Sequence, residues 1–257
     1  MPVTDDAVAT ARRWVEGSER LVVLTGAGIS TDSGIPDFRG PQGVWTKNPQ
    51  AEKASNIRHY VDDPEVRKTA WRMRLDSPFL RAEPNVGHTV LAEVDRKRRL
   101  HALITQNVDG LHIEAGVDPE KVIEVHGNVR EFVCLDCGDR GPLRDALDRV
   151  RAGELDPPCR VCGGILKTAT ISFGQSLREE DIAAAQRAAV ECDVLLAVGT
   201  TLGVYPVAGC VPLAKQTGAR IVIINAEPTE MDDLADLVLR GQIKELLPAV
   251  LAGVTNS

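Results

Sequence analysis

Four of the six cysteines form two pairs, each with two residues between its members. The pairs are Cys134 with Cys137 and Cys159 with Cys162. Two CxxC pairs separated by a long spacer are typical of a zinc ribbon, in which four thiolates surround Zn²⁺ as a tetrahedron. Because no coordination position stays open for water, the predicted zinc is structural. Redox chemistry is the alternative for a CxxC pair, although neither pair lies in a thioredoxin-like βαβ context.

The remaining cysteines, Cys192 and Cys210, stand among apolar residues, which favours packing in a core over chemistry. The first residues, MPVTDDAVATARRWVEG, contain no apolar run of the kind that a signal peptide has. No later stretch approaches membrane-spanning length. We therefore expect a cytoplasmic protein with reduced thiols and no membrane partner.

The segment after the apolar run 21–25 reads GAGIS and resembles a dinucleotide-binding turn. In such a turn, glycines let the backbone approach a pyrophosphate, and the next helix offers its positive N-terminus. Ser30 replaces the third glycine of the usual pattern, so an ordinary tight turn remains the alternative.

Residues 34–40, GIPDFRG, present an acid, an aromatic ring and an arginine at three successive positions. A loop that covers a charged, partly aromatic ligand would use all three side chains. A surface loop with an ion pair explains them about as well.

Two further polar motifs end predicted strands. TQNVDGLH at 105–112 lies where an open α/β sheet has its ligand crevice, so Asn107 and Asp109 are candidates to bind a carboxamide. EVHGN at 124–128 places His126 at the end of another strand, with a glycine behind it. A lone histidine is more often packed or exposed than catalytic, but the neighbouring polar motifs favour a chemical role for this one.

Apolar runs rich in Val, Ile and Leu must position these side chains. They are LVVLT (21–25), LHALIT (100–105), KVIEV (121–125), ATISF (169–173), VLLAVG (194–199), RIVIIN (220–225) and DLVLR (236–240). Such runs are typical of strands that are buried on both faces. Helical periodicity between several of them predicts βαβ units and a Rossmann-like, doubly wound parallel sheet. The predicted helices cover 5–16, 179–190, 205–216 and 243–251.

Two stretches interrupt the alternation of strands and helices. Residues 41–87 contain polar helical fragments without a strand signal, and residues 127–168 are rich in Cys, Gly, Pro and charge. We predict that these two insertions together form a small domain, helical in the first part and zinc-binding in the second. The large Rossmann-like domain then comprises residues 1–40, 88–126 and 169–257.

The net charge of -7 and the pI near 5.3 argue against direct nucleic-acid binding, because the chain would repel a phosphate backbone on average. The basic run 96–99 follows a helical pattern, where cations near the C-terminal end complement the helix dipole. Cationic partners, including lysine-rich tails, suit an acidic protein better.

Taken in order, GAGIS, GIPDFRG, TQNVDGLH, His126 with its glycine, the two CxxC pairs, GTTL (199–202) and NAEPT (225–229) match the motifs of sirtuins. The chain resembles this Sir2 family over nearly its whole length. The resemblance implies NAD-dependent deacylation of protein lysines, with NAD as co-substrate, one structural zinc and acylated lysine proteins or peptides as partners. In that chemistry the acyl oxygen attacks the nicotinamide ribose, nicotinamide leaves, and the acyl group passes to the ribose. The products are O-acyl-ADP-ribose and free lysine.

The resemblance also implies roles for particular residues. His126 is expected to be the catalytic base, since an unperturbed histidine pKa lies near neutral pH. Asn107 is the second expected catalytic residue and, with Asp109, lines the nicotinamide pocket. The positions expected to bind NAD are Gly26, Ala27, Gly28, Ser30, Asp37, Phe38, Arg39, Gln106, Asn107, Asp109, Gly199, Thr200, Thr201, Asn225, Ala226, Glu227 and Ile243.

In this family the substrate peptide pairs as an extra strand between two loops, a mode dominated by backbone contacts. The matching residues are Phe173, Gly174, Gln175, Gly203, Val204 and Tyr205. Gln175 stands where the family usually has glutamate, and the proline common after it is absent. The resemblance therefore leaves the peptide preference open.

Sirtuins that prefer acidic acyl groups carry a tyrosine and an arginine three residues apart in the helical insertion. The nearest candidates here are Ala70 with Met73, or Trp71 with Arg74, and neither pair matches. We therefore expect acetyl or another uncharged acyl group.

Three alternatives stay open on the sequence. A nicotinamide-dependent dehydrogenase would use the same sheet, but it leaves the zinc ribbon and GIPDFRG unexplained. A zinc-ribbon binding module would bind its partner without NAD. Mono-ADP-ribosyl transfer is a variant within the resembled family.

Overall fold

The computed structural model describes residues 4–36 and 55–255. Its larger sheet has six strands in the order β3-β2-β1-β7-β8-β9, and every neighbouring pair is parallel. The strands are β1 (Leu21–Thr25), β2 (Leu100–Thr105), β3 (Val122–Glu124), β7 (Val194–Val198), β8 (Arg220–Ile224) and β9 (Leu237–Leu239). From β1 the chain adds β2 and β3 on one side of the sheet, and then β7, β8 and β9 on the other side. The sheet is therefore doubly wound, and its topological switch point lies between β1 and β7. The predicted fold class is confirmed.

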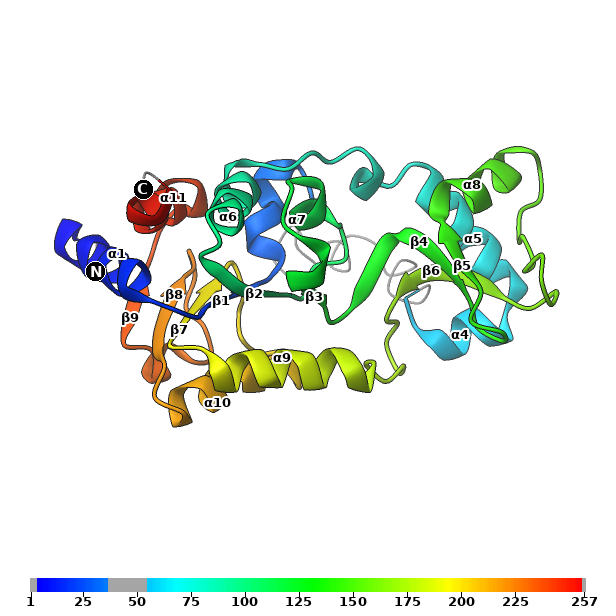
Figure 1. The fold of residues 1–257 in the computed structure, drawn as a ribbon. Helices are drawn as coiled ribbons and strands as arrows, with labels where there is room; N and C mark the ends of the chain where they lie inside the picture. The colour runs from blue at the N-terminus through cyan, green and yellow to red at the C-terminus, as the bar shows by residue number, and fades with distance from the viewer. Residues whose placement is uncertain (1–3, 37–54, 256–257) are drawn as a thin grey trace.

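Helices cover both faces of this sheet (Figure 1). One face carries α1 (Asp5–Gly17), α6 (Val86–Arg96), α7 (Leu111–Glu114) and α11 (Ile243–Thr255), and the other carries α9 (Glu179–Glu191) and α10 (Cys210–Gln216). Short 3-10 segments are η1 (Ala27–Ser33), η2 (Pro78–Leu80), η3 (Pro119–Lys121), η4 (Val207–Gly209) and η5 (Asp232–Leu234). Since both faces are covered, the central strands β1 and β7 are buried at every position and carry almost only apolar side chains.

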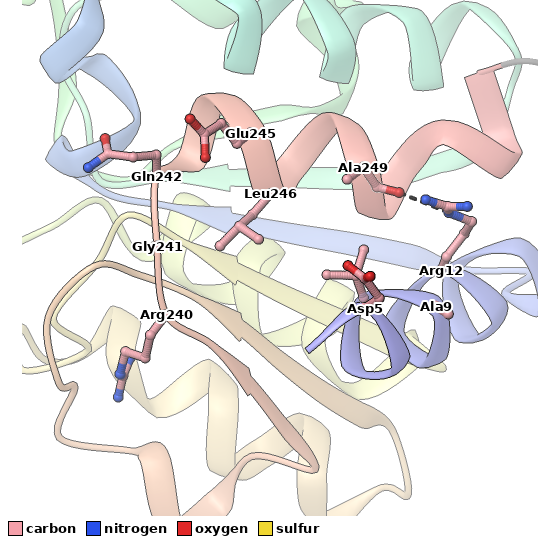
Figure 2. A pocket seen from close by; sticks show the side chains of 10 residues that line it. Asp5, Ala9, Arg12, Arg240, Gly241, Gln242, Glu245, Leu246 and Ala249 are labelled. Carbon is pink, nitrogen blue, oxygen red and sulfur yellow. Dashed lines mark hydrogen bonds between the residues drawn. The ribbon is translucent and has the colours of Figure 1, made fainter. Parts of the chain in front are cut away.

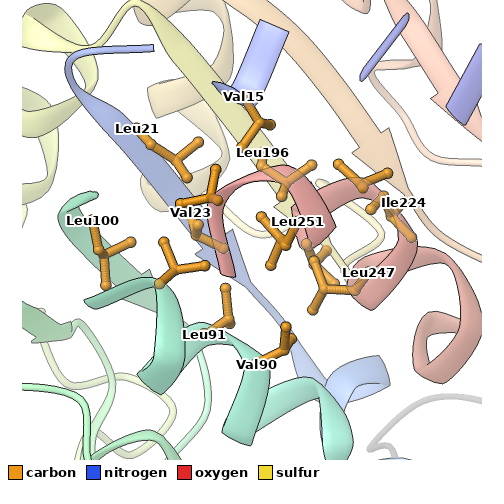
Figure 3. Close-up of a cluster of buried hydrophobic side chains, with 14 of the residues drawn as sticks. Val15, Leu21, Val23, Val90, Leu91, Leu100, Leu196, Ile224, Leu247 and Leu251 are labelled. Carbon is orange, nitrogen blue, oxygen red and sulfur yellow. The ribbon is translucent and has the colours of Figure 1, made fainter. Parts of the chain in front are cut away.

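The core on the α11 side is drawn in Figure 3. Val23 of β1 and Leu196 of β7 point toward Leu91 of α6 and Leu251 of α11, and all four are buried. Alternate residues of the same strands, such as Leu24, pack on the opposite face against the α9 and α10 layer. The buried residues Cys192 and Cys210 belong to that second cluster, as the sequence predicts, and burial raises their pKa values to about 12 and about 11.

The small domain lies beside the β3 edge of the large sheet (Figure 1). It contains an antiparallel sheet in the order β5-β4-β6, formed by β4 (Gly127–Cys134), β5 (Arg140–Pro142) and β6 (Leu166–Thr170). The helices beside it are α4 (Ile57–Asp62), α5 (Pro64–Leu75) and α8 (Leu143–Arg151). Trp71, Leu147 and Leu166 are buried together in its core.

The strand expected at 169–173 is wrong in position and partner. The structure places β6 at 166–170, where it pairs antiparallel with β4 rather than joining the parallel sheet. The sequence LKTAT hides this strand because its buried Lys167 breaks the apolar pattern. The ammonium of Lys167 donates to the carbonyls of Thr168 and Thr170, which satisfies a buried polar group inside its own strand.

No helix within residues 4–36 and 55–255 has the length and apolar character needed to cross a membrane.

Candidate active site and metal site

The loops after β1 and β7 meet at the switch point of the sheet. The N–H of Gly26 donates to the carbonyl of Val198 at 3.1 Å, and the N–H of Gly28 donates to the carbonyl of Gly199 at 2.8 Å. A Cβ on Gly26 or Gly28 would lie only 2.7 or 2.8 Å from the opposite loop. These glycines are therefore required for the close contact between the two loops.

Gly199 joins a third element to this junction. Its φ of +63° is a conformation that glycine adopts at no steric cost. A Cβ at this position would lie 2.9 Å from Cδ1 of Ile243, the first residue of α11. The structure thus brings Ile243, one of the positions that we expect to bind NAD, to the end of β7.

Asn107, Asp109 and Ser30 form one buried hydrogen-bonded group at the ends of β1 and β2. The hydroxyl of Ser30 donates to Oδ2 of Asp109 at 2.8 Å, and Nδ2 of Asn107 donates to Ser30 Oγ at 3.1 Å. The second proton of that amide goes to the carbonyl of Gly26 at 3.1 Å. Ser30 is 1% exposed, and its hydroxyl bonds the side chains of Asn107 and Asp109.

His126 follows β3 and is half-buried. Its Nδ1 lies 2.7 Å from the backbone carbonyl of Gln106, an acceptor, so Nδ1 carries the proton. In the neutral ring, Nε2 then holds the lone pair and is free to act as a base. Burial lowers the pKa of His126 below its ordinary value of 6.5, against the opposing effect of the bond to Gln106, so the ring is neutral at pH 7.

Gln106 links His126 to the two neighbouring strands. Its N–H donates to the carbonyl of Thr25 at 3.0 Å, and its side-chain amide donates to Oγ1 of Thr200 at 3.0 Å. Through the hydrogen bonds of Gln106, His126 is therefore connected to the ends of β1, β2 and β7.

Gly127, directly after His126, has a φ of +74°. A Cβ there would lie 2.1 Å from the carbonyl oxygen of Ala169, so only glycine fits between β4 and β6. The carbonyl of His126 in turn accepts a 2.7 Å hydrogen bond from the N–H of Ile171. The chain that leaves β6 thus begins beside the histidine.

That chain continues into the first predicted substrate segment. The N–H of Phe173 donates to the carbonyl of Ser55 at 2.8 Å, and the carbonyl of Phe173 accepts from Ile57 at 3.0 Å. One edge of this segment is therefore already paired, in parallel, with the helical insertion. The side chains of Phe173 and of Tyr205, from the second predicted segment, are 42% and 66% exposed.

The remaining predicted NAD residues follow β7 and β8. Thr200 is buried and also accepts from the N–H of Leu202, while Thr201, Ala226 and Glu227 are exposed. Asn225 is held by a 2.7 Å bond from its side chain to the carbonyl of Glu227. Asp37, Phe38 and Arg39 lie outside the described residues.

A pocket of about 580 Å³ opens between α1 and the start of α11, as Figure 2 shows. Gly241 and Gln242 line it together with Asp5 and Arg12, whose Nε donates to the carbonyl of Ala249 at 2.9 Å. No residue from the ends of β1, β2, β3 or β7 lines this pocket. It is therefore distinct from the junction that gathers the polar side chains.

The four paired cysteines meet in the small domain, and their sulfur atoms all lie within 4.8 Å of one another. Sγ of Cys134 is 3.5 Å from that of Cys162, and Sγ of Cys137 is 3.7 Å from that of Cys159. Zinc–sulfur bonds of about 2.3 Å in a tetrahedron require sulfur atoms about 3.8 Å apart. The distances and the all-thiolate donor set fit Zn²⁺, and the four ligands close its coordination shell.

The candidate residues for acyl selectivity lie mainly in the core of the small domain. Ala70 and Trp71 are buried, and Arg74 donates from Nε and Nη2 to Oγ1 of Thr168. The Arg74 guanidinium also lies 5.5 Å from the centre of the Trp71 ring. The guanidinium of Arg74 is therefore already engaged by Thr168 and Trp71.

The sequence did not predict several residues that contact the candidate site residues. Arg130 of β4 donates from Nε to the carbonyl of Asp109 at 2.8 Å. Two buried histidines, His88 and His112, lie behind Ser30 and Thr25. A histidine within the apolar side of a predicted helix was the available signal for His88, but one polar residue does not make a motif.

Known proteins resemble this chain over most of its length. A sequence model described as the Sir2 family matches residues 26–206. "NAD-dependent protein deacetylase 2" of Streptomyces coelicolor is 50% identical over 93% of this chain and 99% of its own length. "NAD-dependent protein deacetylase 1" of Bradyrhizobium diazoefficiens is 44% identical over 90% of this chain and 89% of its own.

Solved structures agree with these matches. A Sir2 with a deacetylated p53 peptide and 3'-O-acetyl ADP ribose has a TM-score of 0.85 at 32% identity, and covers 95% of this chain and 97% of its own. A Sir2 bound to acetylated peptide has a TM-score of 0.84 at 30% identity, and covers 97% of this chain and 99% of its own. The chain belongs to the Sir2 family.

Proposed function

We propose that this protein removes acetyl or other uncharged acyl groups from protein lysines in an NAD-dependent reaction that releases nicotinamide and O-acyl-ADP-ribose. NAD supplies the ribose that leaves nicotinamide and accepts the acyl group. The observation that carries the proposal is the histidine at the strand ends: the carbonyl of Gln106 holds the Nδ1 proton of His126 and leaves Nε2 as a free base. A dehydrogenase could also use a histidine base, but that alternative leaves the four-cysteine site without a role.

The residues that we assign to the reaction are those predicted from the sequence. Asn107 and Asp109 are proposed to bind the carboxamide of nicotinamide, because both are buried and fixed at the ends of the strands beside His126. The loops at 26–30, 199–201 and 225–227, with Ile243, are proposed to hold the rest of NAD. The exposed segments around Phe173 and Tyr205 are proposed to bind the peptide.

The predicted domain division remains a proposal, with β6 assigned to the small domain, which moves the boundary from 168/169 to the end of β6. We also propose a cytoplasmic location, since four thiolates that bind zinc require a reducing compartment. The four cysteines are proposed to hold one structural Zn²⁺.

The function is tested by mass spectrometry of the products formed with NAD and a panel of lysine peptides carrying acetyl, propionyl, succinyl and malonyl groups. The expected products are nicotinamide, free lysine peptide and O-acyl-ADP-ribose, with the uncharged acyl groups removed fastest. Formation of NADH, or transfer of ADP-ribose to the peptide without loss of the acyl group, would contradict the proposal.

The rate of deacylation should not change through neutral pH and should fall on acidification. The base acts in its deprotonated form, and burial holds the pKa of His126 below 6.5, so the neutral form predominates at pH 7 and is lost only below the lowered pKa. Glu124 is the competing group, because burial raises its pKa to about 7. A pH profile of kcat/KM for the protein and for Glu124→Gln separates the two. The acidic limb must persist in the variant if it belongs to His126.

Asp109→Asn is expected to weaken nicotinamide inhibition and nicotinamide exchange by about 10- to 100-fold, the usual range for a hydrogen bond to a charged acceptor. Oδ2 of Asp109 accepts from Ser30 and Oδ1 accepts from the N–H of Leu111 at 2.9 Å. An asparagine amide presents one oxygen, so one of these two donors must face an N–H₂ group. Inhibition constants and exchange rates measure the effect, and unchanged values for both would remove Asp109 from the pocket.

A further inference from the structure

Two buried histidines lie behind the site on the side of α6 and α7. The rings of His88 and His112 have their centroids 4.9 Å apart, and their exposed fractions are 0% and 2%. Burial lowers both pKa values, that of His88 to about 4, in spite of the opposing charge of Asp109. Both rings are therefore neutral at physiological pH, and each has one donor and one acceptor nitrogen.

The start of α6 determines which nitrogen of His88 carries the proton. The N–H of Asn85 donates to Nδ1 of His88 at 3.2 Å, as part of a capping box at the N-terminus of the helix. A backbone N–H is only a donor, so Nδ1 must be the acceptor and Nε2 must carry the hydrogen. Nε2 lies 3.3 Å from Oγ of Ser30 and therefore donates to it.

This donor completes the hydrogen bonds of Ser30. A hydroxyl has one proton and two acceptor positions. The oxygen accepts from Nδ2 of Asn107 and from Nε2 of His88, and its proton goes to Oδ2 of Asp109. If Nε2 of His88 were unprotonated, the hydroxyl of Ser30 could rotate to donate to that nitrogen and would leave Asp109.

We propose that His88 is a positioning residue that acts through Ser30 to hold Asp109 and Asn107 in the orientation that binds nicotinamide. This inference rests on the proposed function, which places nicotinamide beside Asp109 and Asn107. The helix cap at Asn85 sets the tautomer of His88, the tautomer sets the direction of the Ser30 hydroxyl, and the hydroxyl holds the carboxylate. Asn85 also donates from its side chain to the carbonyl of Ile29 at 2.8 Å, so the same cap anchors the loop that carries Ser30.

The carboxylate keeps acceptor capacity for a ligand. Each oxygen of Asp109 accepts one hydrogen bond from the protein, Oδ2 from Ser30 and Oδ1 from Leu111, which leaves a further lone pair on each. Arg130 holds the backbone of the same residue through its carbonyl. The carboxylate of Asp109 is thus held by Ser30 and Leu111, and its backbone carbonyl is held by Arg130. His88 acts on the carboxylate, through Ser30.

The test compares His88→Phe with His88→Gln. Phenylalanine removes both the acceptor for Asn85 and the donor to Ser30, whereas the glutamine amide offers an oxygen that can accept from Asn85 and an N–H that can donate to Ser30. Nicotinamide inhibition and exchange should weaken about 5- to 20-fold in His88→Phe, the effect of roughly one hydrogen bond, and should stay within about threefold of the parent in His88→Gln. ADP-ribose lacks nicotinamide, so its Kd, measured by calorimetry, should change less than about twofold in either variant.

A merely structural role predicts a different pattern. Both variants would then lower the unfolding temperature and weaken every ligand alike. Equal loss of nicotinamide binding in the two variants, or no loss in folded His88→Phe, would overturn the proposal.

The tautomer of His88 is measured separately by ¹⁵N-detected NMR of the parent protein without ligands. A proton on Nε2 is expected, and a proton on Nδ1 would also overturn the inference. If the parent protein binds neither ADP-ribose nor nicotinamide, the proposed function itself fails. Failure of the His88 inference alone is different, because the parent protein then still binds both ligands.

Discussion

His126→Ala should lower deacylation by about 10²–10⁴-fold, the usual contribution of a general base, while the Kd for NAD changes little. The substitution removes Nε2, the free base, and the bond from Nδ1 to Gln106. The fold around it should persist, because the contact to Ile171 uses the backbone carbonyl of His126 and the turn depends on Gly127. Nicotinamide leaves before the step that needs the base, so nicotinamide exchange should fall less than deacylation.

Single-turnover assays of both reactions and a titration with NAD measure these effects. His101→Ala is the matched control, since it removes a histidine that is bonded to Glu191 away from the junction of the strand ends. This control should keep the parental rate. Near-normal deacylation by folded His126→Ala would end the case for His126 as the base.

Cys134→Ala should abolish stoichiometric zinc binding and lower the unfolding temperature by roughly 5–10 °C, with loss of solubility. Cys134 ends β4, is 1% exposed, and packs in the same core as Trp71 and Leu147. Without zinc, the zinc–thiolate bonds that connect the two CxxC turns are lost. Activity should fall as a consequence, because β4 and β6 position the chain on either side of His126.

Zinc content by mass spectrometry and thermal unfolding are the measurements for this variant. Cys210→Ala is the control, because it removes a thiol that is equally buried but lies in the core of the large domain. It should retain one zinc per chain. A Cys134→Ala protein with full zinc and parental stability would show that the cluster is not the metal site.

The parallel sheet could be predicted because its central strands β1 and β7 are buried on both faces, so that runs such as LVVLT carry no polar residue except at the end. The small sheet could not be read in the same way. Its strand β6 contains Lys167 and Thr168, whose polar groups are satisfied by neighbouring backbone and side chains rather than by water. A buried polar residue that is bonded locally leaves no periodic signal in the sequence.

The site was predictable as a set of motifs but not as a set of hydrogen bonds. The motifs placed His126, Asn107 and Asp109 together, and the structure brings them to one edge of the sheet. The sequence did not reveal that Ser30 and the first glycines also make contacts between protein segments that are far apart in the sequence. His88 was missed for the same reason, since its partner Ser30 lies 58 residues away.

The bond that fixes His126 ends on a main-chain carbonyl, and this has a genetic consequence. Every amino acid has that carbonyl, so no substitution at position 106 deletes the acceptor itself. A codon change there alters the amide that contacts Thr200, and so the fit of the neighbouring loop, but the proton on Nδ1 keeps its partner. The position of the proton on His126 therefore depends on the path of the backbone and not on the side chain at position 106. It should persist when that side chain changes, although the contact to Thr200 would then be altered.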